Sequence, residues 1–237
     1  MNAFSIDPDE QIDDLFLKNY KIIQKQGCFR YGTDAVVLSD FAAKYIKKGS
    51  RLLDVGTGTG ILPLLLSAKT EAAELVGLEI QEEMVRLAER SVHLNEQSGA
   101  LKQGRVRIVE GDIRNAKEYF PPRSFDVVVT NPPYKRNGTG IRSGNERLDL
   151  ARHEISCTLP QIVQSASFLL KSRGDFLMVH HPERLADALE ALRACRLEPK
   201  ELQFVYSDLQ ARPILFLVRA VLFGGKNLVI EKGIEVK

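Results

Sequence analysis

The stretch Arg51-Leu-Leu-Asp-Val-Gly-Thr-Gly-Thr-Gly60 decides the fold, because a short apolar run stands directly before three closely spaced glycines. Residues 51–55 predict a buried strand, and a helix is expected from about Gly60 to Lys69. Glycines between a strand and a helix let the backbone approach a ligand, at which the first helix N–H groups point. The spacing G-x-G-x-G is not that of a dinucleotide site, which would require glycine at position 61.

Beyond this turn, β-branched runs alternate with helical patterns, which predicts a parallel sheet covered by helices. The further strands are expected at 75–79, 106–110, 125–130 and 175–179, and the further helices at 82–97, 156–171 and 182–195. Two apolar runs, 202–206 and 214–222, have no helical pattern between them and predict a terminal antiparallel hairpin. The expected fold is therefore α/β and Rossmann-like, with a seven-stranded, mostly parallel sheet and helices on both faces.

Composition narrows the class of protein. The 237 residues suit one compact domain, and 44% hydrophobic and 27% charged residues are ordinary for a globular protein. Three scattered cysteines form neither a disulfide framework nor a zinc pattern, so we expect a reducing, cytoplasmic environment and no metal. The start lacks the basic and then apolar run of a signal peptide, and no apolar stretch approaches the roughly 18 residues of a membrane span. A monomer without membrane contact is favoured.

Charge is distributed unevenly along a chain whose net charge is only +2. Residues 1–14 hold five acidic and no basic residues and are expected to form a flexible N-terminus. Residues 15–50 form an expected N-terminal cap segment with a helix at 34–47, and 51–237 form the main domain. Two basic segments, 15–51 and 134–153, are compatible with a polyanionic partner such as nucleic acid, although most such runs are solvated faces. The basic residues of the second segment, Lys135, Arg136, Arg142, Arg147 and Arg152, are candidate nucleic-acid-binding residues.

Two acidic residues lie at strand ends where a nucleoside ligand would need them. Glu79 ends the second strand, nineteen residues after Gly60, and can accept hydrogen bonds from both hydroxyls of a ribose. Asp112 follows the third strand and can accept from an adenine amino group. With the glycine turn, this constellation resembles the class I S-adenosylmethionine-dependent methyltransferases over residues 51–222. The resemblance implies S-adenosylmethionine as cofactor, S-adenosylhomocysteine as product, and a cofactor site lined by Asp54, Gly56, Gly58, Gly60, Glu79, Asp112, Ile113 and Asn131.

Asn131-Pro132-Pro133-Tyr134 follows the apolar fourth strand, at the sheet edge where open α/β sheets hold their sites. A planar amine conjugated to a ring is a poor nucleophile. An asparagine oxygen and a backbone carbonyl can accept its two N–H bonds and turn its lone pair toward a methyl donor. The prolines fix the backbone, and the tyrosine offers a face for a flipped base. The motif resembles that of methyltransferases acting on adenine N6, guanine N2 or protein glutamine; a proline turn is the structural alternative.

Three further motifs narrow the substrate. They are Gly32-Thr33-Asp34 before a helix, Ala151-Arg-His153-Glu-Ile155, and His181-Pro-Glu-Arg184. Together with the motifs above, they resemble the bacterial tRNA1(Val) adenine N6-methyltransferase family over about residues 15–230. The resemblance implies a tRNA partner, a target adenine 37 held by residues 131–134, a cofactor pocket closed by residues 32–34, and a loop 135–152 that faces RNA. Thr33 or Asp34 can alternatively be a helix N-cap, and His153 can be either a catalytic or a capping residue.

Three other functions remain open on the sequence. A protein glutamine methyltransferase shares the N-P-P-Y motif, but such enzymes usually carry a longer helical domain before the first strand. A ribosomal RNA guanine N2-methyltransferase more often ends the motif in phenylalanine. A non-catalytic, cofactor-binding RNA module would keep the fold, although intact Asp54, Glu79, Asn131 and Tyr134 favour an enzyme.

Overall fold

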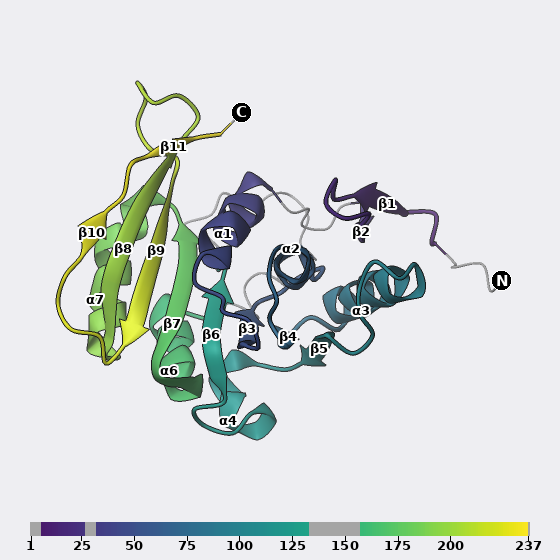
Figure 1. The fold of residues 1–237 in the computed structure, drawn as a ribbon, viewed down its shortest axis with the longest axis horizontal. Helices are drawn as coiled ribbons and strands as arrows, with labels where there is room; N and C mark the ends of the chain where they lie inside the picture. The colour runs from purple at the N-terminus through teal and green to yellow at the C-terminus, as the bar shows by residue number, and fades with distance from the viewer. Residues whose placement is uncertain (1–5, 27–31, 133–156, 237) are drawn as a thin grey trace, which may run out of the picture.

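The computed structural model describes residues 6–26, 32–132 and 157–236. Its main sheet runs in the order β10-β8-β9-β7-β6-β3-β4-β5, with β11 also paired to β8 (Figure 1). The strands are β3 (Arg51–Val55), β4 (Glu74–Glu79), β5 (Val106–Glu110), β6 (Phe125–Thr130), β7 (Leu170–His180), β8 (Leu197–Tyr206), β9 (Leu215–Leu222), β10 (Val229–Ile230) and β11 (Ile234–Glu235). The α-helices are α1 (Thr33–Ala43), α2 (Ile61–Lys69), α3 (Glu82–Gln97), α4 (Ala116–Tyr119), α6 (Leu159–Leu169) and α7 (Leu185–Ala194), with 3-10 turns η1 (Ile113–Asn115) and η2 (Pro182–Arg184).

The pairing directions confirm the α/β, Rossmann-like fold. Strands β3 to β7 pair in parallel, whereas β9 is antiparallel to both β7 and β8. All seven expected strands are present, and the terminal antiparallel hairpin is β8 with β9. The expected strand number differs from the nine that residues 51–132 and 157–236 form in this sheet, because β10 and β11 add two residues each to the outer edge of β8. Strands this short carry no alternating pattern that a sequence could reveal.

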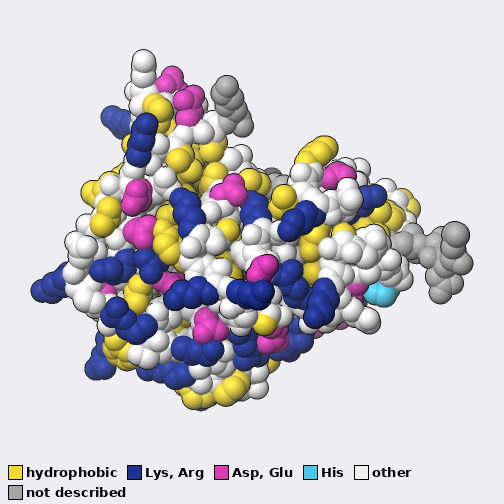
Figure 2. Space-filling view, viewed as in Figure 1, with side chains coloured by type: hydrophobic (Ala, Val, Ile, Leu, Met, Phe, Trp, Pro, Cys, Tyr) yellow, Lys and Arg dark blue, Asp and Glu magenta, His cyan; other side chains and the backbone are white. Residues whose placement is uncertain are grey.

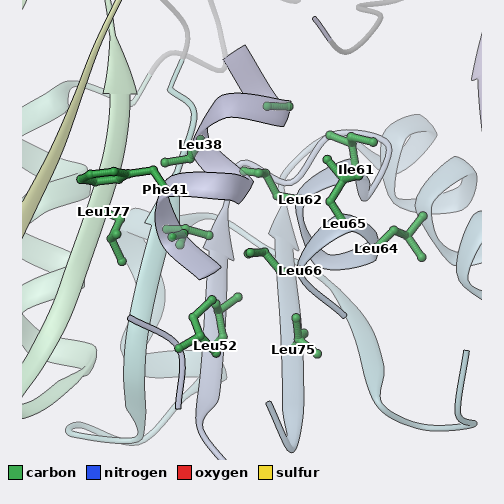
Figure 3. Close-up of a cluster of buried hydrophobic side chains, with 14 of the residues drawn as sticks. Leu38, Phe41, Leu52, Ile61, Leu62, Leu64, Leu65, Leu66, Leu75 and Leu177 are labelled. Atoms are coloured by element: carbon green, nitrogen blue, oxygen red, sulfur yellow. The ribbon is translucent and has the colours of Figure 1, made fainter. Parts of the chain in front are cut away.

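Helices cover both faces of the sheet, because alternate strand residues point to opposite sides. Leu52 and Leu177 pack with α1 and α2 in one cluster, as Figure 3 shows for Leu38, Phe41 and the leucines of α2. The neighbouring positions Leu53 and Met178 pack with α6 and α7 in a second cluster. The two cores hold the carboxyl ends of β3, β4 and β6 in fixed register, which positions the site described below.

The N-terminal segment differs from the expectation that residues 1–14 are flexible. Residues Glu10–Asp14 form β1, which pairs antiparallel with β2 (Lys21–Lys25) in a separate sheet beside α3. Helix α3 holds β2 through two polar side chains. The amide of Asn95 bonds both the N–H and the carbonyl of Lys21, and the hydroxyl of Ser91 accepts from the Ile23 N–H at 3.0 Å. In β1 itself, Glu10 pairs with Arg90 of α3 at 2.6 Å, so both strands contact this helix.

Element boundaries also shift where local signals conflict. Helix α1 begins at Thr33 and ends at Ala43, four residues before the expected end. Its N-cap is Gly32 without a side-chain bond, so neither Thr33 nor Asp34 is the cap. Strand β7 begins at Leu170, five residues early, through Arg173 at a positive φ and Gly174. In the described ranges, no helix is long and apolar enough to cross a membrane.

Candidate active site

The glycine turn joins β3 to α2 in a conformation that explains its composition. Gly56, Gly58 and Gly60 have φ values of +73°, +54° and +82°, which side-chain-bearing residues rarely adopt. A Cβ at position 56 or 58 would meet no atom within 4 Å, so the turn faces open space there. A Cβ at position 60 would lie 3.2 Å from that of Ala88, which shows that this glycine also lets α3 approach. The turn is therefore both tight and accessible.

Asp54 lies beneath this turn with 1% of its surface exposed. Neither of its carboxylate oxygens makes an ordinary hydrogen bond to another described residue, and the same holds for the Thr57 hydroxyl beside it. Burial raises the pKa of Asp54 to about 7; the nearby Thr57 hydroxyl opposes this shift and the Glu79 carboxylate adds to it. A buried carboxylate without a bonding partner favours a cationic or hydrogen-donating ligand at this position.

The raised pKa of Asp54 makes a testable prediction about stability. Above about pH 4 the unfolded chain releases this proton, whereas the folded chain keeps it until about pH 7. The free energy of unfolding should therefore fall as pH rises through this window, by up to about 4 kcal/mol from this group. Asp54→Asn, which stays neutral, should gain stability relative to the parent between pH 5 and 8. Urea unfolding at several pH values measures the difference, and a difference independent of pH would contradict the assignment.

Glu79 ends β4 with both oxygens held by the backbone. Oε2 accepts from the Gly58 N–H at 2.9 Å, and Oε1 accepts from the N–H groups of Ile80 and Gln81 at 2.9 Å each. The side chain is buried, with 5% exposure. The bond to Gly58 ties the acidic strand end directly to the glycine turn. Its carboxylate is thereby fixed in one orientation before any ligand binds.

The third strand end places Asp112 and Ile113 beside each other. Asp112 caps η1 by accepting from the Arg114 N–H at 2.9 Å, and its other oxygen accepts from Arg114 Nε at 2.7 Å. This guanidinium pairing lowers the pKa of Asp112. Ile113 is buried, with 7% exposure. Both oxygens of Asp112 are thus already bonded to Arg114, a feature that the sequence pattern did not indicate.

Asn131 at the end of β6 contacts the start of α1. Its Nδ2 donates to Asp34 Oδ2 at 2.9 Å, and Asp34 Oδ1 accepts from the Ala35 N–H at 2.9 Å. Asp34 is buried, with 9% exposure. A Cβ at Gly32 would lie only 3.0 Å from Asp34 Oδ1, so glycine leaves room for this carboxylate. Asp34 therefore fixes the orientation of the Asn131 amide, with Nδ2 directed toward the Asp34 carboxylate.

The structure brings most of the expected cofactor residues to one edge of the sheet. Asp54 and Glu79 lie at the carboxyl ends of β3 and β4, the glycine turn follows β3, and Asn131 follows the adjacent β6. Asp34 joins them from α1. Pro132 is buried beside them. The remaining expected residues, Pro133, Tyr134, Lys135, Arg136, Arg142, Arg147, Arg152 and His153, lie outside the described residues.

Three contacts at this edge were absent from the sequence prediction. Thr130 Oγ1 donates to the Val55 carbonyl at 2.9 Å and joins the ends of β6 and β3. A Cβ at Gly77 in β4 would come within 2.7 Å of Thr57, so that glycine seats the turn. His180, at the end of β7, is buried and stacks on Phe216, and burial lowers its pKa to about 4. Thr57 belongs to the GTGTG motif, but only the fold shows which residues Thr57 contacts.

Comparison with known proteins gives this geometry a family. A family model described as a methyltransferase domain matches residues 46–210. A tRNA1(Val) (adenine(37)-N6)-methyltransferase of Bacteroides thetaiotaomicron is 30% identical over 174 residues, covering 73% of this chain and 68% of that protein. One of the same name from Tolumonas auensis is 29% identical over 193 residues, covering 77% and 76%. The chain belongs to the tRNA1(Val) (adenine(37)-N6)-methyltransferase family. It is an S-adenosylmethionine-dependent methyltransferase.

Solved structures agree on the fold. A predicted O-methyltransferase from Agrobacterium tumefaciens has a TM-score of 0.68 at 21% identity, covering 85% of this chain and 86% of that chain. A Thermus thermophilus 16S rRNA N2 G1207 methyltransferase, solved with its cofactor and guanosine, has a TM-score of 0.61 at 19% identity and covers 92% and 52%. The described residues contain no group of three or more potential metal ligands.

The residues at the sheet edge fit S-adenosylmethionine. The open turn at Gly56 and Gly58 lets the cofactor approach the backbone closely. The Asp54 carboxylate, which has no hydrogen-bond partner among the described residues, suits the cationic groups of the cofactor. Glu79, fixed by three N–H groups, retains lone pairs for the ribose hydroxyls.

Glu79→Gln tests this arrangement. An amide has one acceptor atom, so its nitrogen would face at least one backbone N–H, and the unmet donor costs about 1–3 kcal/mol. We expect the dissociation constant for S-adenosylmethionine to rise at least about tenfold, in line with the loss of a charge-assisted bond. Isothermal titration calorimetry measures it. Glu110→Gln, at the exposed register partner in β5, should leave the affinity unchanged. Equal affinities for the two variants would remove Glu79 from the site.

Proposed function

We propose that this enzyme methylates N6 of an adenine in tRNA, with adenine 37 of tRNA1(Val) as the target. The observation that carries the proposal is the Asn131–Asp34 hydrogen bond beside the glycine turn. An orienting carboxylate behind an asparagine amide suits a site that must accept an N–H bond from a planar amine. The family names support adenine in tRNA as the carrier of that amine.

The proposed mechanism assigns separate tasks to the residues of this chain. S-adenosylmethionine supplies an electrophilic methyl group on a sulfonium. Asn131 Oδ1 and the backbone carbonyl of Pro132 accept the two N–H bonds of the exocyclic amine, which turns its lone pair out of conjugation. Tyr134 stacks on the base once it has flipped out of the RNA. Positioning and electrostatics would then supply most of the rate enhancement. The N–CH3 bond would form as the S–CH3 bond breaks, S-adenosylhomocysteine would leave, and the proton lost from the cationic amine would pass to water.

The substrate is tested by methyl transfer from labelled S-adenosylmethionine. Bulk tRNA lacking the modification and purified translation release factor serve as parallel substrates, and labelled RNA is digested to nucleosides. We expect N6-methyladenosine from tRNA. Label in the release factor would replace the substrate by a protein glutamine, and N2-methylguanosine would replace the base. Cofactor binding without transfer to any of these would favour a binding module.

A further inference from the structure

A basic hollow lies beyond the carboxyl-terminal end of α1, away from the glycine turn. It has a volume of about 380 Å³. Lys44 and Lys47 border it just after α1, Arg173 borders it from β7, Lys200 from β8, and Arg219 from β9. These residues lie up to 175 positions apart in sequence, yet they converge on one face of the sheet. Figure 2 shows Lys and Arg side chains spread over this face of the molecule, with Asp and Glu side chains among them.

The two acidic groups at this hollow, Asp175 and Glu201, are both bonded to one arginine. Arg219 Nε donates to Asp175 Oδ1 at 2.7 Å, and its Nη1 donates to Glu201 Oε1 at 2.8 Å. The ring of Tyr45 lies 4.3 Å from the same guanidinium, and its hydroxyl donates to Glu201. Arg219 is therefore held in place by two carboxylates, and the five basic side chains of the hollow outnumber these two acidic groups.

The other four cations have no ion-pair partner among the described residues. Lys200 and Arg173 bond only the backbone carbonyls of Gly225 and Phe223, at 3.0 and 3.1 Å. Lys44 lies over the ring of Phe41, and Lys47 is exposed. The hollow thus presents an excess of positive charge on a concave surface, which concentrates the field and attracts a polyanion.

The hollow lies close enough to the methylation site for one RNA molecule to contact both. Helix α1 runs from Asp34 at the Asn131 site to Lys44 at the hollow, and ten residues of helix span about 15 Å. Along β7, Met178 pairs with Thr130 next to Asn131, and Asp175 lies three residues earlier, about 10 Å away. These spans correspond to a few base-pair steps of a nucleic-acid duplex, in which successive phosphates advance roughly 3 Å along the axis.

We propose that this hollow, formed by Lys44, Lys47, Arg173, Lys200 and Arg219, binds the phosphate backbone of the tRNA stem next to the methylated loop. The inference rests on the proposed tRNA substrate and adds a second contact surface to it. Two lysines of the basic segment 15–51 contribute to the hollow, so the proposal gives part of this segment a role in RNA binding. Arg219 serves as its fixed centre, and the lysines supply mobile, salt-sensitive contacts.

The test compares two triple variants that remove equal charge. Lys44→Ala, Lys47→Ala and Lys200→Ala empty the hollow of its lysines, whereas the control combines Lys102→Ala, Lys117→Ala and Lys232→Ala outside it. Fluorescence anisotropy measures the dissociation constant for unmodified tRNA at several salt concentrations. We expect the first variant to bind roughly 10- to 100-fold more weakly at 0.15 M salt, with a log–log salt slope shallower by about 2 to 3. The control should stay within about twofold of the parent, as expected for lysines without phosphate contacts.

Two results would overturn the proposal. One is an affinity and salt slope of the hollow variant equal to those of the control. The other is an equal loss of affinity for an anticodon-loop oligonucleotide that lacks the stem, since the hollow should not contact that RNA. Because the readout is binding, failure of methyl transfer to tRNA is seen separately in the parent enzyme. Matching melting temperatures of the two variants confirm that both are folded.

Discussion

Asn131→Ala is expected to lower kcat for methyl transfer by about 1,000-fold, the scale seen when a group that orients and polarises the reacting centre is removed. Alanine removes the oxygen that accepts an amine N–H, so the lone pair of the target amine stays conjugated. The turn at Gly56, the Glu79 carboxylate and Asp54 remain in place, because they lie on β3 and β4. Affinity for S-adenosylmethionine should therefore change by no more than about threefold, because the substitution leaves these cofactor contacts intact.

Single-turnover kinetics with saturating cofactor and tRNA measure the chemical step, and calorimetry measures cofactor affinity. The substitution also deprives the buried Asp34 Oδ2 of a donor, which costs about 1–3 kcal/mol of stability, so the melting temperature is recorded alongside. Near-normal turnover would remove Asn131 from catalysis. A loss of cofactor binding as large as the loss of turnover would make it a cofactor ligand instead.

Asp34→Asn is expected to lower kcat by about 100-fold, because a small misplacement of a catalytic group has effects of this size. Both oxygens of Asp34 accept hydrogen bonds, one from Ala35 and one from Asn131. An amide at position 34 has one acceptor for these two donors, so one bond is lost or the Asn131 amide turns over. Either outcome moves the amide oxygen away from the substrate. The KM for tRNA should change less than kcat, as expected of a positioning residue.

Exchange of the two side chains separates positioning from a merely structural role. In Asp34→Asn with Asn131→Asp, the amide at 34 accepts from Ala35 and donates to the carboxylate at 131, which restores the original pair. That carboxylate still presents an acceptor to the amine. We expect the double variant to be at least about tenfold more active than either single variant, a coupling typical of residues in direct contact. Additive losses would show that Asp34 acts on the site in another way. Asp40→Asn, at an exposed position of α1 paired with Lys69, is the matched control and should keep normal turnover.

Local sequence was sufficient to predict the central part of the fold. The strands 51–55, 106–110 and 125–130 and the helix 82–97 were predicted with the bounds that the structure shows. The strands 51–55 and 125–130 are short, largely buried runs, 106–110 is a β-branched run that is only partly buried, and the helix has a regular amphipathic pattern. The glycine turn and Glu79 were predicted for a similar reason, because strand ends and their following turns are local features. The roles of the expected site residues remain proposals.

The parts of the fold that local sequence did not predict depend on contacts between residues that are distant in sequence. The early start of β7 and the strands β10 and β11 form because an existing sheet edge offers hydrogen bonds to whatever chain lies beside it. Strand β1 is stable despite its acidic residues, because Glu10 pairs with Arg90 of α3 at 2.6 Å and β2 is anchored by Asn95. None of these partners is near in sequence.

The sequence alone determined the fold class, the family resemblance and the residue types at the ends of β3, β4 and β6, because periodicity and turn chemistry are encoded over a few neighbouring residues. Only the tertiary structure decided that Asp34 orients Asn131 across 97 positions, that Asp54 is buried without a bonding partner, and that lysines from two separate segments share one hollow. The physical reason is that burial and pairing are properties of the packed chain. A side chain acquires its partners and its pKa only when distant segments meet.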